Sequence, residues 1–279
     1  MKLLVNRYEE ITYERLDRLT KENGAHVFGK TRVADVLPIN DSNIPRDDFS
    51  YALKSHFDFT VTDGSYEILF AVEFDGPSHK SAIQRERDLR KNRLCERFSF
   101  PILRINANYL DLQFRGMDLL TYFVEVWFMS RAFDDMLERG VLGPDADFDP
   151  SMIVLDPKRK ERFPFWLSAD VQINLQKLQK KKVIRNGIPR HWIGIDGDEN
   201  YRCLGWLDVT ASSHVVIETG MRAQQFPIVI SDVLQQISIF DLWAELQRVL
   251  AGESIASTQE GLRKRMERYG RYRKVSYSL

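Results

Sequence analysis

The chain of 279 residues is 43% hydrophobic and 29% charged, a composition typical of a soluble globular protein with one large domain or two smaller ones. Its 40 basic and 40 acidic residues cancel, which excludes a whole-molecule field that would draw it to nucleic acid or to membranes. The presence of only two cysteines argues against a disulfide framework or a cysteine zinc site. The sequence has no apolar run long enough to span a bilayer and no signal-peptide core, so we expect a cytoplasmic protein without membrane contact.

The first fifty residues contain one clear helical pattern. Apolar spacing predicts a helix over residues 8–21 that ends at Asn23-Gly24. A short strand at residues 26–28 and a covered edge at 32–37 follow. Residues 38–50 are rich in turn formers, which predicts a loop.

Residues 56–63 alternate between apolar and polar side chains, which predicts a strand. The Asp63-Gly64 pair predicts a hairpin that returns as a second strand over residues 66–74. Alternation places Asp58 on the face opposite the apolar side chains of the first strand. Those apolar side chains are Phe57, Phe59 and Val61.

A charged helix is predicted over residues 81–98, followed by an apolar strand at residues 101–105 that contains one arginine, Arg104. This order of strands and helices predicts an α/β sandwich around a mixed sheet. The helix residues that we expect to face inward are Ile83, Leu89, Leu94 and Phe98.

The rest of the chain predicts a long buried helix over residues 115–139 and then a second, smaller α+β domain, whose helices we expect at residues 169–182 and 228–250. Three short strands are expected between these helices. The predicted division is a first domain at 1–139, a linker at 140–157, an accessory domain at 158–258 and a basic tail, flexible or a short helix, at 259–279.

Two carboxylates end the second strand of the hairpin, in the sequence V-E-F-D-G-P-S-H (72–79). Glu73 and Asp75 lie two residues apart, so both side chains project to the same face. If Phe59 and Val72 pack in one core, Asp58 emerges beside them, since opposed side chains of antiparallel strands lie about 5 Å apart. Three such carboxylates suit a hard cation, Mg²⁺ or Mn²⁺, which could polarise a phosphoryl oxygen and activate water.

These residues resemble the PD-(D/E)XK nuclease superfamily, which has the restriction-endonuclease-like fold. The matching pieces are V-F-G-K-T-R-V-A-D-V-L (27–37), H-F-D-F (56–59), V-E-F-D-G-P-S-H (72–79), R-D-L-R-K (87–91) and F-P-I-L-R-I (100–105). The E-x-D-G-x-x-H pattern is similar to a bacterial branch that is close to very-short-patch repair endonucleases. The resemblance covers about residues 8–110.

The resemblance implies a Mg²⁺-dependent endonuclease that hydrolyses phosphodiester bonds, in DNA rather than RNA. It implies that Asp58 and Glu73 bind the metal and that Asp75, a further ligand, stands where the superfamily has its usual lysine. Lys91 on the following helix would replace that lysine and orient water or stabilise charge on phosphate. His79 would bind phosphate or transfer a proton, and Glu10 or Glu14 would complete the site.

Basic residues interleaved with aromatic ones in the second half are typical of nucleic-acid contact, and we select Lys180, Lys181, Lys182 and Arg185 for this role. Two alternatives stay open. The first is an inert nuclease-like domain that binds nucleic acid without cutting it. The second is a nuclease effector controlled by a C-terminal sensing or interaction module. A monomer and a homodimer are both compatible with the sequence.

Overall fold

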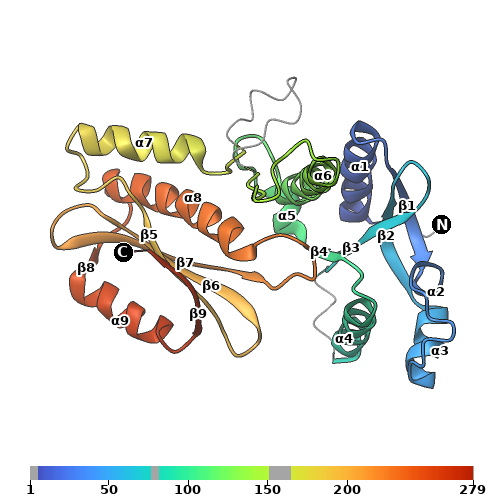
Figure 1. The fold of residues 1–279 in the computed structure, drawn as a ribbon. Helices are drawn as coiled ribbons and strands as arrows, with labels where there is room; N and C mark the ends of the chain where they lie inside the picture. The colour runs from blue at the N-terminus through green and yellow to red at the C-terminus, as the bar shows by residue number, and fades with distance from the viewer. Residues whose placement is uncertain (1–5, 77–81, 151–164, 279) are drawn as a thin grey trace. The chain divides into compact units, whose positions relative to one another are not determined.

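The computed structural model describes residues 6–76, 82–150 and 165–278. The chain forms two compact units (Figure 1). The first contains residues 1–146 together with 224–228, and the second contains residues 147–223 and 229–279. Both units combine helices with a sheet, so the chain is a mixed α/β protein.

The first unit has a mixed four-stranded sheet in the order β1-β2-β3-β4. The β1–β2 and β2–β3 pairs are antiparallel, and β3–β4 is parallel, with α4 connecting the parallel pair. The strands are β1 (His26–Arg32), β2 (His56–Thr62), β3 (Ile68–Phe74) and β4 (Ile102–Ile105). The helices are α1 (Arg7–Glu22), α2 (Val33–Val36), α3 (Arg46–Lys54), α4 (Ala82–Arg97), α5 (Ala107–Asp111) and α6 (Leu119–Glu138).

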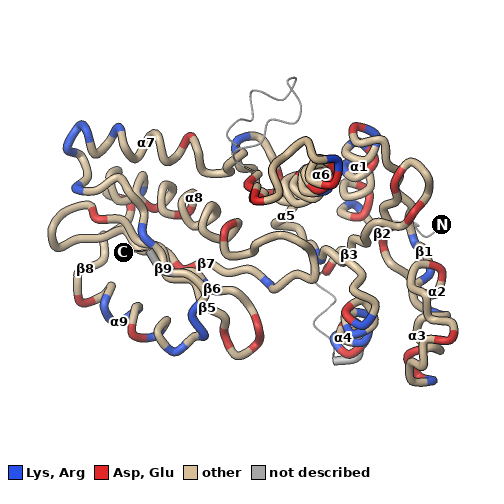
Figure 2. The backbone as a smooth tube through the Cα atoms, in the orientation of Figure 1, with Lys and Arg blue, Asp and Glu red and all other residues tan. Residues whose placement is uncertain are grey.

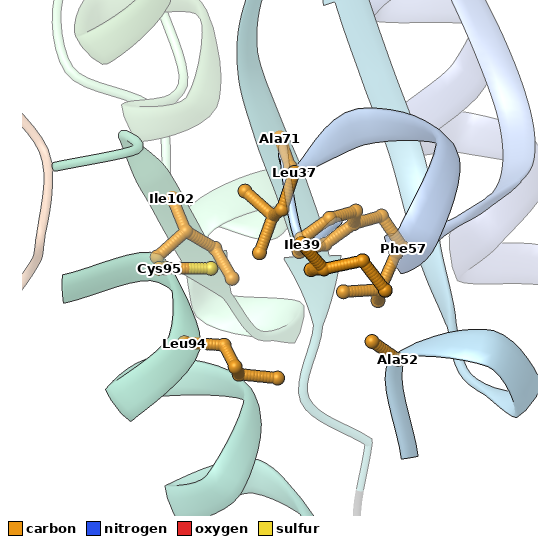
Figure 3. Close-up of a cluster of buried hydrophobic side chains, with 9 residues drawn as sticks. Leu37, Ile39, Ala52, Phe57, Ala71, Leu94, Cys95 and Ile102 are labelled. Atoms are coloured by element: carbon orange, nitrogen blue, oxygen red, sulfur yellow. The ribbon is translucent and has the colours of Figure 1, made fainter. Parts of the chain in front are cut away.

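Helices cover both faces of this sheet. On one face, Tyr13 of α1 contacts Phe59 of β2, and Trp127 of α6 contacts Phe70 of β3. On the other face, α4 packs against the sheet through Leu94 and Cys95. The resulting cluster (Figure 3) contains Val33, Leu37, Ile39, Ala52, Phe57, Ala71, Leu94, Cys95 and Ile102.

The predicted alternation along β2 is wrong at one position. Phe57 belongs to the cluster on the α4 face, whereas Phe59 contacts α1 on the opposite face. The break falls at Asp58, opposite Lys30, where the β1–β2 ladder omits a pair and Lys30 has a φ of 53°. The register is the same on both sides of this position, so the change of facing comes from the local backbone conformation, which is left-handed at Lys30, and not from an inserted residue.

The predicted inward face of α4 is also wrong in part. Leu94 is buried, as expected, but Leu89 is 56% exposed, and charged residues take the inner positions near it. The side chain of Ile83 lies outside the described residues. A second difference is α3, which begins inside the stretch predicted as a loop and includes its residues 46–50; Asp47, Asp48 and Lys54 of α3 complement the helix dipole.

The second unit has a five-stranded antiparallel sheet in the order β8-β7-β6-β5-β9, with helices on both faces (Figure 1). Helices α7 and α8 pack on one face through a core that includes Leu207 and Leu242, and α9 packs on the other against Trp206. The strands are β5 (Arg190–Ile195), β6 (Asn200–Asp208), β7 (Ser213–Arg222), β8 (Ser257–Thr258) and β9 (Arg273–Ser278). The helices are α7 (Ala169–Lys180), α8 (Ile230–Leu250) and α9 (Gln259–Tyr269).

The structure differs from the predicted division in two respects. The basic tail at 259–279 is neither free nor separate, since α9 carries buried Leu262 and Tyr269 and β9 pairs with β5. Residues 224–228, from the middle of the predicted accessory domain, belong to the first unit. There the backbone of Gln225 pairs with Ile102 at the edge of β4, and Phe226 contacts Phe70.

No helix in the described parts of the chain is long and apolar enough to cross a membrane.

Candidate functional site

Asp58 and Glu73 meet where the β2–β3 ladder ends. The last backbone pair is Phe59 with Val72. Beyond it, carboxylates replace carbonyl groups as acceptors: the amide of Phe74 donates to Asp58 Oδ2 at 3.0 Å, and the amide of Asp58 donates to Glu73 Oε1 at 3.2 Å. The splayed strand ends therefore bring the two predicted metal ligands side by side.

The ammonium of Lys91 lies against this pair from the α4 side. Its Nζ is 2.7 Å from Glu73 Oε1 and donates to the carbonyl of His56 at 2.8 Å. It also lies 5.3 Å from the centre of the Phe57 ring. Glu73 is 4% exposed and Lys91 6% exposed, so this ion pair is removed from water.

The helix spacing explains why Lys91 points inward. Lys91 and Asn92 come three and four residues after Asp88, and Cys95 comes four and three residues after them, which places all four on a single face of α4. That face is covered by the sheet: Asp88, Lys91 and Cys95 are buried. A helix that turns charges toward a sheet loses hydration free energy, so its stability depends on partners for those charges.

Burial raises the pKa of the Glu73 carboxyl. The positive charge of Lys91 opposes this effect, Asp58 adds to it, and Arg104 opposes it again. Two opposing effects therefore act on the pKa of Glu73: desolvation favours its neutral form, and two buried cations favour its charged form. This combination is common at functional sites.

The third predicted carboxylate, Asp75, is bound by Arg104. The guanidinium Nη1 of Arg104 lies 2.8 Å from Asp75 Oδ1 and 3.6 Å from Asp88 Oδ1, and its Nε donates to Asn92 at 2.9 Å. Arg104 is next to Glu73 in the parallel β3–β4 register and is 5% exposed. Burial would lower the pKa of Arg104, but the surrounding carboxylates outweigh it and raise that pKa.

Gln224 fixes the backbone of Arg104. Its side-chain oxygen accepts the Arg104 amide and its side-chain nitrogen donates to the Arg104 carbonyl, both at 2.9 Å. The same nitrogen donates to the Tyr109 hydroxyl at 3.1 Å. The segment 224–228 therefore extends the sheet at β4 and holds a charged residue of the site.

Lys30 binds Asp58 from the α1 side. Its Nζ is 2.6 Å from Asp58 Oδ1 and 2.9 Å from Glu9 Oε1. Glu9 is itself oriented by the capping box of α1, in which its other carboxylate oxygen accepts the Asn6 amide at 2.9 Å. A hollow of about 300 Å³ opens here, lined in part by Glu10. The first-helix acid nearest the site is thus Glu9, while Glu14 is exposed and does not line the hollow.

The predicted residues are thus brought together in part. Asp58, Glu73 and Lys91 converge, whereas Asp75 joins Arg104. Within the described residues, no group of three or more His, Cys, Asp and Glu side chains is arranged to hold a metal ion. His79 lies outside the described residues. Lys180, Lys181, Lys182 and Arg185 are exposed at and after the end of α7 (Figure 2).

Sequence reasoning gave no role to Arg104, Asp88 and Lys30. One signal for Arg104 was available, because it is the single charge in an otherwise apolar strand. Such a residue needs a buried counter-charge. Lys30 gave no comparable signal, because lysine on an edge strand is ordinary.

Comparison with known proteins gives one partial match. A family model described as a protein of unknown function (DUF2726) matches residues 1–115, which contain the site except for Gln224. Neither the curated proteins nor the solved structures contain a match to this chain.

Proposed function

We propose that the protein is a metal-dependent nuclease that hydrolyses phosphodiester bonds in DNA. The observation that carries the proposal is the convergence of Asp58, Glu73 and Lys91 where β2 and β3 separate. Stability alone gives little reason to bury an ion pair there, because desolvation offsets most of its attraction.

The strand order supports a restriction-endonuclease-like fold. An antiparallel hairpin carries Asp58 and Glu73, a helix follows, and a further strand pairs in parallel with the strand of Glu73. This is the order that the sequence resemblance implies, with α1 on the opposite face of the sheet.

Asp58 and Glu73 would hold Mg²⁺ or Mn²⁺, since both cations prefer carboxylate oxygens. The donor set fits such an ion on one condition: Lys30, whose side chain is 51% exposed, must release Asp58. When bound, the cation would polarise a phosphoryl oxygen and lower the pKa of a bound water. Asp75 enters the proposal as the partner of Arg104 rather than as a ligand, because their ion pair is largely buried.

Lys91 would take the place of the superfamily lysine. Its ammonium is held at a fixed position by Glu73 and by the carbonyl of His56, so it can stabilise negative charge on a phosphate without reorganising. Lys180, Lys181, Lys182 and Arg185 would contact the backbone of the nucleic acid. In the part of the chain that the structure describes, none of these four side chains forms an ion pair.

The test is hydrolysis by purified protein with Mg²⁺ or Mn²⁺ on single-stranded, duplex and branched DNA and on RNA. We expect wild type to cut DNA, and Asp58→Ala, Glu73→Ala and Lys91→Met each to lose at least about a hundredfold, the size of one catalytic interaction. Glu67→Ala is the matched control, since Glu67 lies exposed in the same hairpin. Equal behaviour of wild type and the Asp58 and Glu73 variants on every substrate contradicts the proposal.

One observation favours an inert nucleic-acid-binding protein instead. Asp58 and Glu73 each already have a lysine partner, so the pair is neutralised without a metal. This alternative predicts that Mn²⁺ does not bind, while DNA affinity is retained and falls steeply with salt. Titration of Mn²⁺ by electron paramagnetic resonance separates the two functions.

The Gln224 contacts favour a further alternative, in which a C-terminal sensing or interaction module controls a nuclease effector. Residues on either side of 224–228 belong to the second unit, so a ligand there could change the hold of Gln224 on Arg104. Hydrogen exchange at the Arg104 amide in wild type and Gln224→Ala would measure how firmly that contact is maintained.

A further inference from the structure

A second hollow, of about 560 Å³, lies between α3 and α4 on the side of the sheet that carries Lys91. Its volume is in the range of small-ligand sites. Lys91 and Asp88 line it from the inner face of α4, so it leads to the buried ion pair with Glu73. Neither the sequence resemblance nor the predicted basic surface of α7 assigns a role to it.

Among the charged residues in the walls of this hollow, basic ones outnumber acidic ones. Lys54 of α3 and Arg87 of α4 are exposed, and neither forms an ion pair with any residue that the structure describes. Arg90 is held more loosely than the buried cations, at 3.6 Å from Asp48 and 3.5 Å from Glu86. The charged lining residues are Lys54, Arg87, Arg90 and Lys91 on the basic side and Asp47 and Asp88 on the acidic side.

Two contacts join the helices that carry these cations. The hydroxyl of Tyr51 on α3 donates to the carbonyl of Arg87 on α4 at 2.9 Å. The guanidinium of Arg90 lies 5.8 Å from the centre of the Tyr51 ring. Ser50 and Ser55 also line the hollow, and the Ser55 hydroxyl donates to the Tyr51 carbonyl at 2.7 Å. Exposed cations without a carboxylate partner suit the oxygens of a phosphodiester.

We infer that this hollow, the α3–α4 cleft, binds the backbone of a nucleic-acid strand, with Lys54 and Arg87 contacting successive phosphates. The inference rests on the proposed function, because Lys91 at the base of the cleft would then meet the phosphate that is cut. It assigns the first unit its own nucleic-acid contact, separate from the basic end of α7. Figure 2 shows the basic residues along α4.

The test is binding of a fluorescein-labelled oligodeoxynucleotide, single-stranded or duplex, measured by anisotropy in EDTA so that no hydrolysis occurs. We expect the double variant Lys54→Gln/Arg87→Gln to bind about tenfold more weakly at about 0.1 M salt. The slope of log affinity against log salt should fall by about 1.4 to 1.8, the contribution of two phosphate contacts.

Arg93→Gln is the matched control. It removes one positive charge from α4, where the cleft variant removes one from α3 and one from α4, at an exposed position that does not line the cleft. We expect its affinity to stay within about twofold of wild type. A triple variant with Lys180, Lys181 and Lys182 changed to Gln measures the other basic surface in the same assay. Thermal melts of all variants confirm that folding is unchanged.

The inference is overturned if the cleft variant binds like Arg93→Gln, or if only the α7 variant loses affinity. Wild-type protein that does not bind the oligonucleotide also overturns it. Hydrolysis is measured separately with metal present. If the cleft variant loses binding and wild type does not hydrolyse the oligonucleotide, the nucleic-acid contact of the cleft is supported and the nuclease proposal is contradicted.

Discussion

The two sheets differ in what they bury against their helices. In the first unit, Glu73, Lys91 and Arg104 lie between the sheet and α4 with Asp88 beside them, all less than a tenth exposed. In the second unit, the core between the sheet and α8 is apolar, with Leu207, Val215 and Leu242 at its centre. Both sheets have helices on two faces, so the architecture does not require buried charge.

Across the described residues, every buried Lys, Arg, Asp and Glu belongs to the first unit. Asp118 has a structural explanation, since it caps α6. In the second unit, a polar group lines the side of a hollow, and its members pair with one another: Asp208 binds both His214 and Arg190. The proposed nuclease would account for this contrast, because its site uses the charges under α4, and the contrast can be tested from the largest expected effect to the smallest.

The largest effect is expected from Lys91→Met, which leaves Glu73 buried without its ammonium. We expect a loss of about 3 to 5 kcal/mol in the free energy of unfolding, measured by urea denaturation with circular dichroism. The double variant Lys91→Met/Glu73→Gln removes both charges and should recover most of that loss.

Lys21→Met is the control, because it removes an exposed ion pair with Asp17 in the same unit and should leave the free energy of unfolding close to that of wild type. If the double variant is as unstable as the sum of the single ones, Glu73 and Lys91 are not coupled, and the contrast between the two sheets loses its main support.

A smaller effect is expected in the second unit, from pH. Burial lowers the pKa of His191, so the folded protein resists protonation there. As pH falls through about 6.5, the unfolded chain binds a proton that the fold does not, and stability decreases; above about pH 7.5 this effect is absent. We expect the free energy of unfolding to decrease as the pH is lowered from about 7 to about 5.5.

His191→Gln should remove that part of the pH dependence, as measured by denaturation followed by tryptophan fluorescence. A variant with the same pH dependence as wild type would show that His191 is not its source.

The smallest effect is expected from Leu89→Gln on α4. Because Leu89 is 56% exposed while Asp88 and Lys91 face inward, the change should alter the free energy of unfolding by less than about 0.5 kcal/mol. Thermal denaturation measures it. A loss of 2 kcal/mol or more would require Leu89 to be a core residue, as the sequence pattern suggested.

Much of the secondary structure followed from local signals. The periodicity of α1, the hairpin at Asp63-Gly64 and the apolar strand β4 all appear close to their predicted positions. These features depend on side chains a few residues apart, so the sequence contains the information that specifies them. The same is true of the shared face of Glu73 and Asp75: Glu73 binds Lys91 of α4, and Asp75 binds Arg104, whose side chain also contacts Asn92 of α4.

Contacts between distant residues decided the rest. The chain alone placed Asp58, Glu73 and Asp75 in one cluster, but the partner of Asp75 depends on Arg104, 29 residues later, which reaches it only through the parallel β3–β4 pairing. The inner face of α4 likewise depends on buried partners. From the sequence alone, Asp88, Lys91 and Asn92 are expected to be exposed to solvent. They face inward because Glu73 and Arg104 lie beside them. The sequence thus pointed to Asp58, Glu73 and Lys91. Only the tertiary structure added Arg104, Asp88 and Lys30 and decided how the charges pair, because a buried charge is stable only where another part of the chain supplies its counter-charge.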